Sequence, residues 1–334
     1  MHALFLASAL LAGCLLAVQA SVNLQLNKAV GTPYGASTLQ LSVATALLAL
    51  LAVAAGAIGA VRLVPDVPVW HLLGGLASPL YITSGILLFP RLGALAAAGL
   101  FVTGQMFASL GLDLFGLLGV ARKPPSLGIA LGALAVLAGI TVIIRGQRPA
   151  RSPAPAVPAT DATSRGGTAT VTAPAAVGAA NGLGQGGWIL LGIVAGAVLP
   201  VQGAVNAALR KDIHEPVTTA MISFIVATIT IAVVLVVLLA TRRTPRPQLG
   251  GLRTMPWWGW LGGACAAAYV TATFTLIPTI GAATTVALTV TGQQVASAVI
   301  DNHGFLRLPR RPLTAPRLSG LALLIAGSVL VQLT

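Results

Sequence analysis

The sequence predicts an all-α integral membrane protein with ten transmembrane helices, arranged as two inverted five-helix repeats. Its 334 residues are 56% hydrophobic and only 7% charged, whereas a soluble domain carries about 25% charged residues. Ten apolar segments are long enough to cross a bilayer, which takes about 20 residues each. The chain also repeats itself, because residues 13–23 return as 196–206 at an offset of 183.

The apolar segments are separated by short joints that carry prolines and charges. In the first half they are residues 3–26, 36–60, 69–89, 92–112 and 127–145. In the second half they are residues 187–209, 217–240, 257–277, 281–300 and 316–333. We therefore expect a first repeat at 1–145, a flexible Pro/Ala/Gly-rich linker at 146–186 and a second repeat at 187–334. Five crossings are an odd number, so the second repeat is expected to lie upside down relative to the first.

The first apolar segment has features of a signal peptide. Leu11-Ala12-Gly13-Cys14 resembles a lipoprotein cleavage site, and Val18-Gln19-Ala20 resembles a signal-peptidase site. No Lys or Arg precedes them, and the same segment recurs at 196–206, where a signal peptide cannot stand. We expect residues 2–26 to be a retained transmembrane helix.

The repeat continues beyond the first helix at an offset of 188. The matched residues in the first half are Trp70, Gly74, Gly75, Tyr81, Pro90, Gly93, 103–105 and Asp113. Their equivalents are Trp258, Gly262, Gly263, Tyr269, Pro278, Gly281, 291–293 and Asp301. A duplicated membrane unit is typical of secondary transporters, which hold substrate where the two copies meet.

The charges indicate a membrane orientation and argue against nucleic-acid binding. The net charge is +13, but the 19 basic residues lie between the apolar segments. Fourteen of them fall in the odd-numbered loops, so the positive-inside rule places these loops in the cytoplasm and both termini outside. The lipid bilayer is therefore an expected partner, and nucleic acid is not.

Amide side chains lie four residues apart on the first helix of each copy. Gln19 and Asn23 form one pair, and Gln202 and Asn206 form the other. This spacing places each pair on one helix face, which must look away from lipid. The pairs either contact substrate or hold helices together by hydrogen bonds worth about 0.6 kcal/mol each.

The fourth helix of each copy carries a longer polar line. The first line is Gln105, Ser109 and Asp113, and the second is Gln293, Ser297 and Asp301. Each line forms a candidate translocation surface that ends in a carboxylate able to bind a coupling proton or cation. The alternative is that each Asp caps a helix end at the headgroup level.

Three further residues near the middle of the apolar segments are candidates for the site. Tyr81 and Tyr269 occupy matching positions, where they either flank a substrate or pack in the core with a bonded hydroxyl. Pro200 is expected to free backbone carbonyls around Gln202, as the broken helices of transporters do.

Several motifs of the second half resemble the YdcZ family of the drug/metabolite transporter superfamily. They are residues 200–206, 256–263, 278–284, 292–293, 301–304 and 308–312. The first half looks like a more diverged copy, with Ala17 in place of Pro200, so the chain looks like a tandem fusion. The resemblance implies a multi-pass exporter of the bacterial inner (plasma) membrane. In ten-helix relatives both termini usually lie in the cytoplasm, which disagrees with the charge count.

Together these features predict a secondary transporter, expected to export a small metabolite or drug-like molecule by alternating access. No nucleotide-binding, metal-binding or catalytic constellation is present in the sequence, so we expect a gradient-driven protein without cofactor that is not an enzyme. The first helices carry amides where small multidrug transporters carry a glutamate, which favours a neutral, zwitterionic or weakly charged small-molecule substrate. The alternative is a non-transporting scaffold or binding protein. The duplication is compatible with a monomer or a homodimer.

Overall fold

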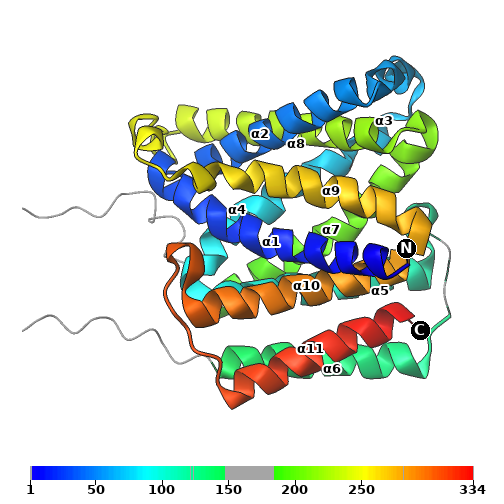
Figure 1. Cartoon of the computed structure of the whole chain (residues 1–334), viewed down its shortest axis with the longest axis vertical. Coiled ribbons are helices and arrows are strands. Elements are labelled where there is room, and N and C mark those ends of the chain that lie inside the picture. The colour runs from blue at the N-terminus through cyan, green and yellow to red at the C-terminus, as the bar shows by residue number, and fades with distance from the viewer. Residues whose placement is uncertain (1, 121, 123, 147–183, 281, 334) are drawn as a thin grey trace, which may run out of the picture.

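The computed structural model describes residues 2–120, 122, 124–146, 184–280 and 282–333 (Figure 1). These residues form helices joined by turns, and no β-strand occurs among them. The linker expected at 146–186 falls mostly on residues 147–183, outside the described residues. Gln185 and Gly186 already belong to the first helix of the second half.

Long helices make up both halves of the chain. The first half contains α1 (His2–Val30), α2 (Pro33–Ala54), α3 (Val69–Leu72), α4 (Ala77–Leu92), α5 (Ala94–Phe115) and α6 (Leu127–Arg145). The second contains α7 (Gln185–Ile213), α8 (Pro216–Ala240), α9 (Leu261–Ile280), α10 (Ala282–His303) and α11 (Ala315–Leu333). Eight spans among the described residues are long and apolar enough to cross a membrane, with α3 and α4 counted as one span. The 20 residues of α9 and the 22 of α10 run beside them (Figure 1).

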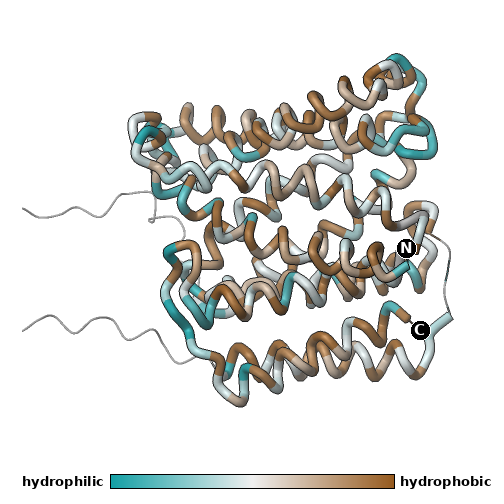
Figure 2. The backbone as a smooth tube through the Cα atoms, viewed as in Figure 1, coloured by the Kyte–Doolittle hydropathy of each residue, from teal (hydrophilic) through white to brown (hydrophobic). Residues whose placement is uncertain are grey.

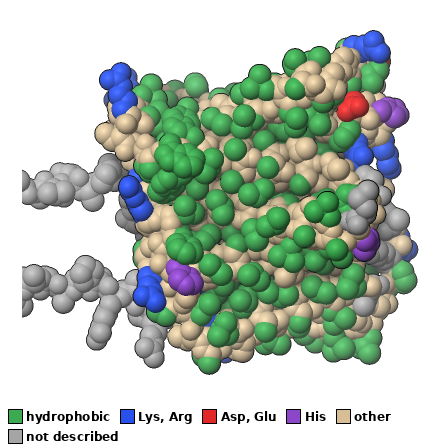
Figure 3. Space-filling model, in the orientation of Figure 1, with side chains coloured by type: hydrophobic (Ala, Val, Ile, Leu, Met, Phe, Trp, Pro, Cys, Tyr) green, Lys and Arg blue, Asp and Glu red, His purple; other side chains and the backbone are tan. Residues whose placement is uncertain are grey.

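The distribution of side chains fits a bilayer. Hydrophobic residues follow the helices, and hydrophilic residues collect in the turns at the two ends of the bundle (Figure 2). In the space-filling view the basic side chains also lie at these ends (Figure 3). A broad apolar belt between two charged rims is the surface expected of a protein that crosses a membrane.

The two ends of the bundle are named here by the chain segments that reach them. α1 begins and α11 ends at the same end, which we call the termini side (Figure 1). The opposite end, where α6 ends at Arg145 and α7 begins at Gln185, is the linker side.

One expected helix boundary is wrong. The apolar segment expected at 36–60 leaves the α-helix at Ala54, because the chain turns at Gly56 with a left-handed φ of 69°. A 3-10 helix, Ala57–Asp66, follows and lies largely exposed. Apolar composition continues across this turn, so hydropathy alone does not mark it. The other long helices lie within a few residues of their expected bounds.

The first helix of each half packs against the fourth long helix of the other half. A Cβ at Gly13 of α1 would meet the backbone of Thr289 in α10, and one at Gly196 of α7 would meet the backbone of Phe101 in α5. These two contacts are equivalent under the sequence offsets of the repeat. Close approach through small residues is the usual way for membrane helices to associate. The halves are thus interleaved rather than set side by side.

Candidate functional site

A cavity of about 370 Å³ lies between the two halves. It is lined by α1, α4 and α5 of the first half and by α7, α9 and α10 of the second, with smaller contributions from α8 and α11. Eight of the twelve predicted site residues line it: Gln19, Tyr81, Gln105, Ser109, Asp113, Gln202, Asn206 and Tyr269. The other four, Asn23, Gln293, Ser297 and Asp301, lie outside it in this conformation.

The cavity occupies only one half of the bundle's thickness. Its lining on α5 runs from Val102 to Asp113 and on α7 from Leu199 to Arg210, which are the parts of both helices that approach the termini side. On α10 the lining begins at Thr285 and ends at Val290. Among the described residues, the lining does not include the linker-side parts of these helices. The space is therefore directed to one face of the membrane.

The two first-helix glutamines are held differently. Gln202 donates a hydrogen bond from Nε2 to the Ser78 hydroxyl over 2.8 Å. Gln19 is 4% exposed, and its Oε1 atom has no hydrogen-bond partner. The sequence also differs at this contact, because Ala266 stands where the first copy has Ser78. A buried acceptor without a donor costs free energy, so Gln19 gains more than Gln202 from a hydrogen bond to a ligand.

The asparagines of the same helices have a packing role. A Cβ at Gly74 would collide with Oδ1 of Asn206, and a Cβ at Gly262 would collide with Oδ1 of Asn23. Each asparagine carbonyl therefore lies directly on the backbone of a glycine from the other half. Asn206 also reaches the cavity, whereas Asn23 is 1% exposed and does not.

The two fourth-helix polar lines have different surroundings. Gln105, Ser109 and Asp113 are partly exposed and face the cavity. Their equivalents Gln293, Ser297 and Asp301 are 2%, 0% and 1% exposed and are enclosed by protein. One pattern of residues is therefore open on α5 and closed on α10.

A hydrogen bond accompanies the closed line. Gln293 donates from Nε2 to the Tyr81 hydroxyl over 3.1 Å, and the Tyr81 ring lies 4.7 Å from the ring of Phe101. The equivalent pair is Gln105 and Tyr269, which both line the cavity. The Nε2 atom of Gln105 is buried and has no partner among the described residues.

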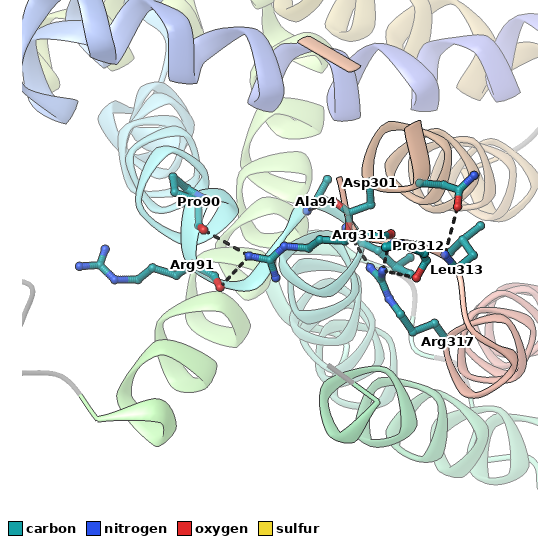
Figure 4. A network of polar contacts seen from close by, with 10 residues as sticks. Pro90, Arg91, Ala94, Asp301, Arg311, Pro312, Leu313 and Arg317 are labelled. Atoms are coloured by element: carbon teal, nitrogen blue, oxygen red, sulfur yellow. Dashed lines mark hydrogen bonds and ion pairs between the residues drawn. The ribbon is translucent and has the colours of Figure 1, made fainter. Parts of the chain in front are cut away.

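The closed line ends in a charged network on the linker side (Figure 4). Asp301 forms an ion pair of 2.6 Å with Arg317 and accepts hydrogen bonds from the backbone N–H groups of Ala94 and Leu95 over 2.8 Å and 3.2 Å. These N–H groups belong to the first turn of α5, where the helix dipole favours a carboxylate. Asp301 thus ties α10 to α5 and α11.

Two arginines complete this network. Arg317 also donates to the carbonyls of Arg311 and Pro312, and Arg311 donates to the carbonyl of Arg91 over 3.1 Å. Burial lowers the pKa of the Arg311 guanidinium, and the nearby charge of Asp301 opposes that shift. The sequence prediction did not include either arginine in the site. The sequence does distinguish Arg317 from its equivalent, because the first repeat has the apolar Ile129 at the same position.

Among the described residues, the cavity lining contains one acidic and one basic residue. Asp113 is the acid, and Arg210 is the base, which donates to the carbonyl of Phe274 over 2.9 Å. Pro200 also lines the cavity, and α7 continues through it without interruption from Gln185 to Ile213. Proline removes one backbone hydrogen bond, and the helix tolerates this loss.

Metal binding finds no support in the described part of the chain. There, no three His, Cys, Asp or Glu residues lie close enough together to hold a metal ion.

Another polar pair joins the halves on the termini side, where His71 of α3 contacts Asp212 of α7.

Known proteins resemble this chain at the level of family and fold. The family model described as "Putative inner membrane exporter, YdcZ" matches twice, over residues 4–142 and 187–330. No curated protein matches. A solved structure described only as "Crystal structure of protein" has a TM-score of 0.54 and 17% sequence identity, covering 99% of this chain and 96% of that one, which indicates a shared fold. Because its two family matches span most of the sequence, this multi-pass inner-membrane chain belongs to the YdcZ family, of which it carries two copies.

Proposed function

We propose that this chain is a gradient-driven secondary transporter that exports a small metabolite or drug-like molecule by alternating access. The observation that carries the proposal is a cavity built from equivalent helices of both halves and directed to one face of the membrane. A scaffold whose polar residues only hold helices together has no need for a cavity lined by unpartnered amides.

Two copies of opposite orientation are a common architecture of alternating-access transporters, and the fold supports this one. α1 runs from the termini side to the linker side, while its equivalent α7 runs the other way (Figure 1). We propose that the ten long spans form two inverted five-helix repeats. Rocking of one repeat against the other would then close the cavity on the termini side and open a matching one on the linker side.

The lining supports a neutral or zwitterionic substrate. Gln19 presents an acceptor without a donor, and Gln105 presents a donor without an acceptor. A molecule that carries both a hydrogen-bond donor and an acceptor satisfies the two amides at once. The described part of the lining has equal numbers of acidic and basic residues, so a strongly charged substrate would gain no net attraction from it.

We propose Asp113 as the site that binds a coupling proton or cation in this conformation. It is partly exposed and lines the cavity, so an ion can reach it. Asp301 is bound to Arg317 and enclosed, and it becomes available only when the linker side opens. Each carboxylate would thus serve one face of the membrane.

Purified protein in proteoliposomes tests the function. Efflux of a panel of amino acids, amides and aromatic drugs is measured with and without a pH gradient. We expect saturable transport of at least one zwitterionic or neutral compound, and loss of most of it in Gln19→Ala, which removes the acceptor that has no donor. The lipid-exposed Thr141→Ala is the matched control and should transport normally. A folded protein that moves no compound under either condition would favour the scaffold.

The orientation of the termini decides the direction in which the cavity faces. The charge count predicts termini outside, and the ten-helix relatives imply termini inside. Fusing green fluorescent protein or alkaline phosphatase to the C-terminus separates these predictions, since the first is fluorescent only in the cytoplasm and the second is active only in the periplasm.

A further inference from the structure

Two glutamine–tyrosine pairs occupy equivalent positions in the repeat, at an offset of 188. Only one of the two pairs is joined by a hydrogen bond. Gln293 of α10 donates to Tyr81 of α4 over 3.1 Å. Gln105 of α5 and Tyr269 of α9 hold the equivalent positions and both line the cavity, where the amide nitrogen of Gln105 is buried without a partner. The same residues thus form a hydrogen bond in one copy and leave it open in the other.

We propose that these pairs are alternating locks, of which one is formed in each conformation of the transporter. In the conformation described here, Gln293–Tyr81 is formed and Gln105–Tyr269 is open. When the cavity closes on the termini side, Gln105 bonds Tyr269 and Gln293 releases Tyr81. This inference rests on the proposed function, since it assumes two conformations that exchange.

Each glutamine stands at the inner end of its own polar line. From Gln293 the closed line runs through Ser297 to Asp301 on the linker side, where the Arg317 network seals it. From Gln105 the open line runs through Ser109 along the cavity lining. The bonded pair therefore belongs to the sealed line and the unbonded pair belongs to the accessible one.

The unpartnered amide of Gln105 gives the open lock a second role. A buried N–H group without an acceptor costs free energy, and two acceptors relieve that cost: the Tyr269 hydroxyl after closure, or a carbonyl or carboxylate of a bound substrate before it. Substrate and lock therefore compete for the same donor.

Tyrosine-to-phenylalanine substitutions test the locks, because each removes one hydroxyl and little else. Tyr81→Phe weakens the lock of the present conformation, and Tyr269→Phe weakens the lock of the opposite one. The two variants should shift the equilibrium in opposite directions, each by about threefold, as expected for an interhelical hydrogen bond in a membrane.

Cysteine accessibility provides the readout. Ser109→Cys reports on the termini side and the equivalent Ser297→Cys on the linker side, both in a Cys14→Ala, Cys265→Ala background. Alanine occupies the positions of both native cysteines in the other repeat. A membrane-impermeant maleimide is added to one face of oriented vesicles, and the labelling rate of each site is measured without substrate.

We expect Tyr81→Phe to slow labelling at position 109 and speed it at position 297, and Tyr269→Phe to do the reverse. Gln293→Leu and Gln105→Leu should repeat these signs, which guards against one variant that folds poorly. Shifts in the same direction, or no shift in well-folded variants, would overturn the locks. If the sites exchange accessibility but no compound is transported, the locks stand and the proposed transport fails.

Discussion

α5 and α10 carry the same three polar residues at the same spacing, and the structure gives them different surroundings. On α5 the line of Gln105, Ser109 and Asp113 faces a cavity. On α10 the equivalent line is enclosed and ends in an ion pair with Arg317. An identical residue pattern in two environments indicates that the difference lies largely in the arrangement of the helices rather than in the pattern itself.

Two sequence differences add to this conformational one. Arg317 has no counterpart, because Ile129 occupies its position in the first repeat, so only the linker side can form this ion pair. Ser78 has Ala266 as its counterpart, so only Gln202 receives a hydroxyl partner. The halves are thus related but not interchangeable. Equivalent point substitutions in the two halves can measure how similarly each residue contributes to stability and transport.

The largest effect is expected at the Asp301–Arg317 pair. Asp301→Asn leaves Arg317 as a buried charge without its partner, and breaking a buried pair in this way costs about 3–5 kcal/mol. The equivalent Asp113→Asn removes a partly exposed charge and should cost about 1 kcal/mol or less. Thermal unfolding of both variants in the same detergent measures the difference.

A double variant provides the control for this experiment. Asp301→Asn combined with Arg317→Met removes both charges and should recover part of the lost stability, because no buried charge then remains. Equal losses in Asp113→Asn and Asp301→Asn would show that the two aspartates are held alike, and the contrast between the open and closed lines would then be wrong.

A smaller and symmetrical effect is expected at the helix crossings. A Cβ at Gly104 would collide with the backbone of Ile193, and one at the equivalent Gly292 would collide with the backbone of Leu10. Gly104→Ala and Gly292→Ala should therefore each destabilise the fold, by about 1–3 kcal/mol. Gly111→Ala, which meets nothing within 4 Å, is the control and should lose no stability.

Gly104→Ala and Gly292→Ala test whether the helix crossings are equivalent in the two halves even though the polar lines are not. Both crossings are formed in the structure, so similar losses indicate that the α1–α10 and α5–α7 contacts persist while the polar lines change. If one glycine tolerates alanine and the other does not, the first and fourth helices of the halves are not equivalent in packing.

The sequence predicted the helical membrane fold and the family correctly, because hydropathy and the repeat report on these features directly. It did not predict the end of α2 at Ala54, since the apolar run continues past the left-handed turn at Gly56. Nor did it indicate that Gln293 bonds Tyr81 while Gln105 and Tyr269 stay apart. A repeat identifies equivalent residues, but the conformation decides which of two equivalent contacts is made.

The role of Arg317 was missed for a related reason. It follows a proline at the start of the last helix, where a basic residue normally indicates only membrane orientation. Its contact with Asp301 joins two helices across the Arg311 loop, and hydropathy carries no information about such a contact. The substrate contacts predicted for the glutamines and tyrosines remain predictions.

The smallest expected effect concerns Ser78 and Ala266. Ser78→Ala removes the partner of Gln202 and should destabilise the protein by about 0.6 kcal/mol. Ala266→Ser offers the Oε1 atom of Gln19 a hydroxyl donor at the equivalent position and should stabilise it by a similar amount. Differential scanning fluorimetry at matched protein concentration resolves changes of opposite sign.

Transport assays of Ala266→Ser then decide what Gln19 does. If Gln19 binds substrate through its free acceptor, the introduced hydroxyl competes with substrate, and KM rises severalfold while the protein becomes more stable. If Gln19 only holds helices together, stability rises and KM stays the same. Higher stability together with weaker substrate binding would identify Gln19 as a binding residue. Its acceptor has no partner in the empty protein, and substrate supplies that partner when it binds.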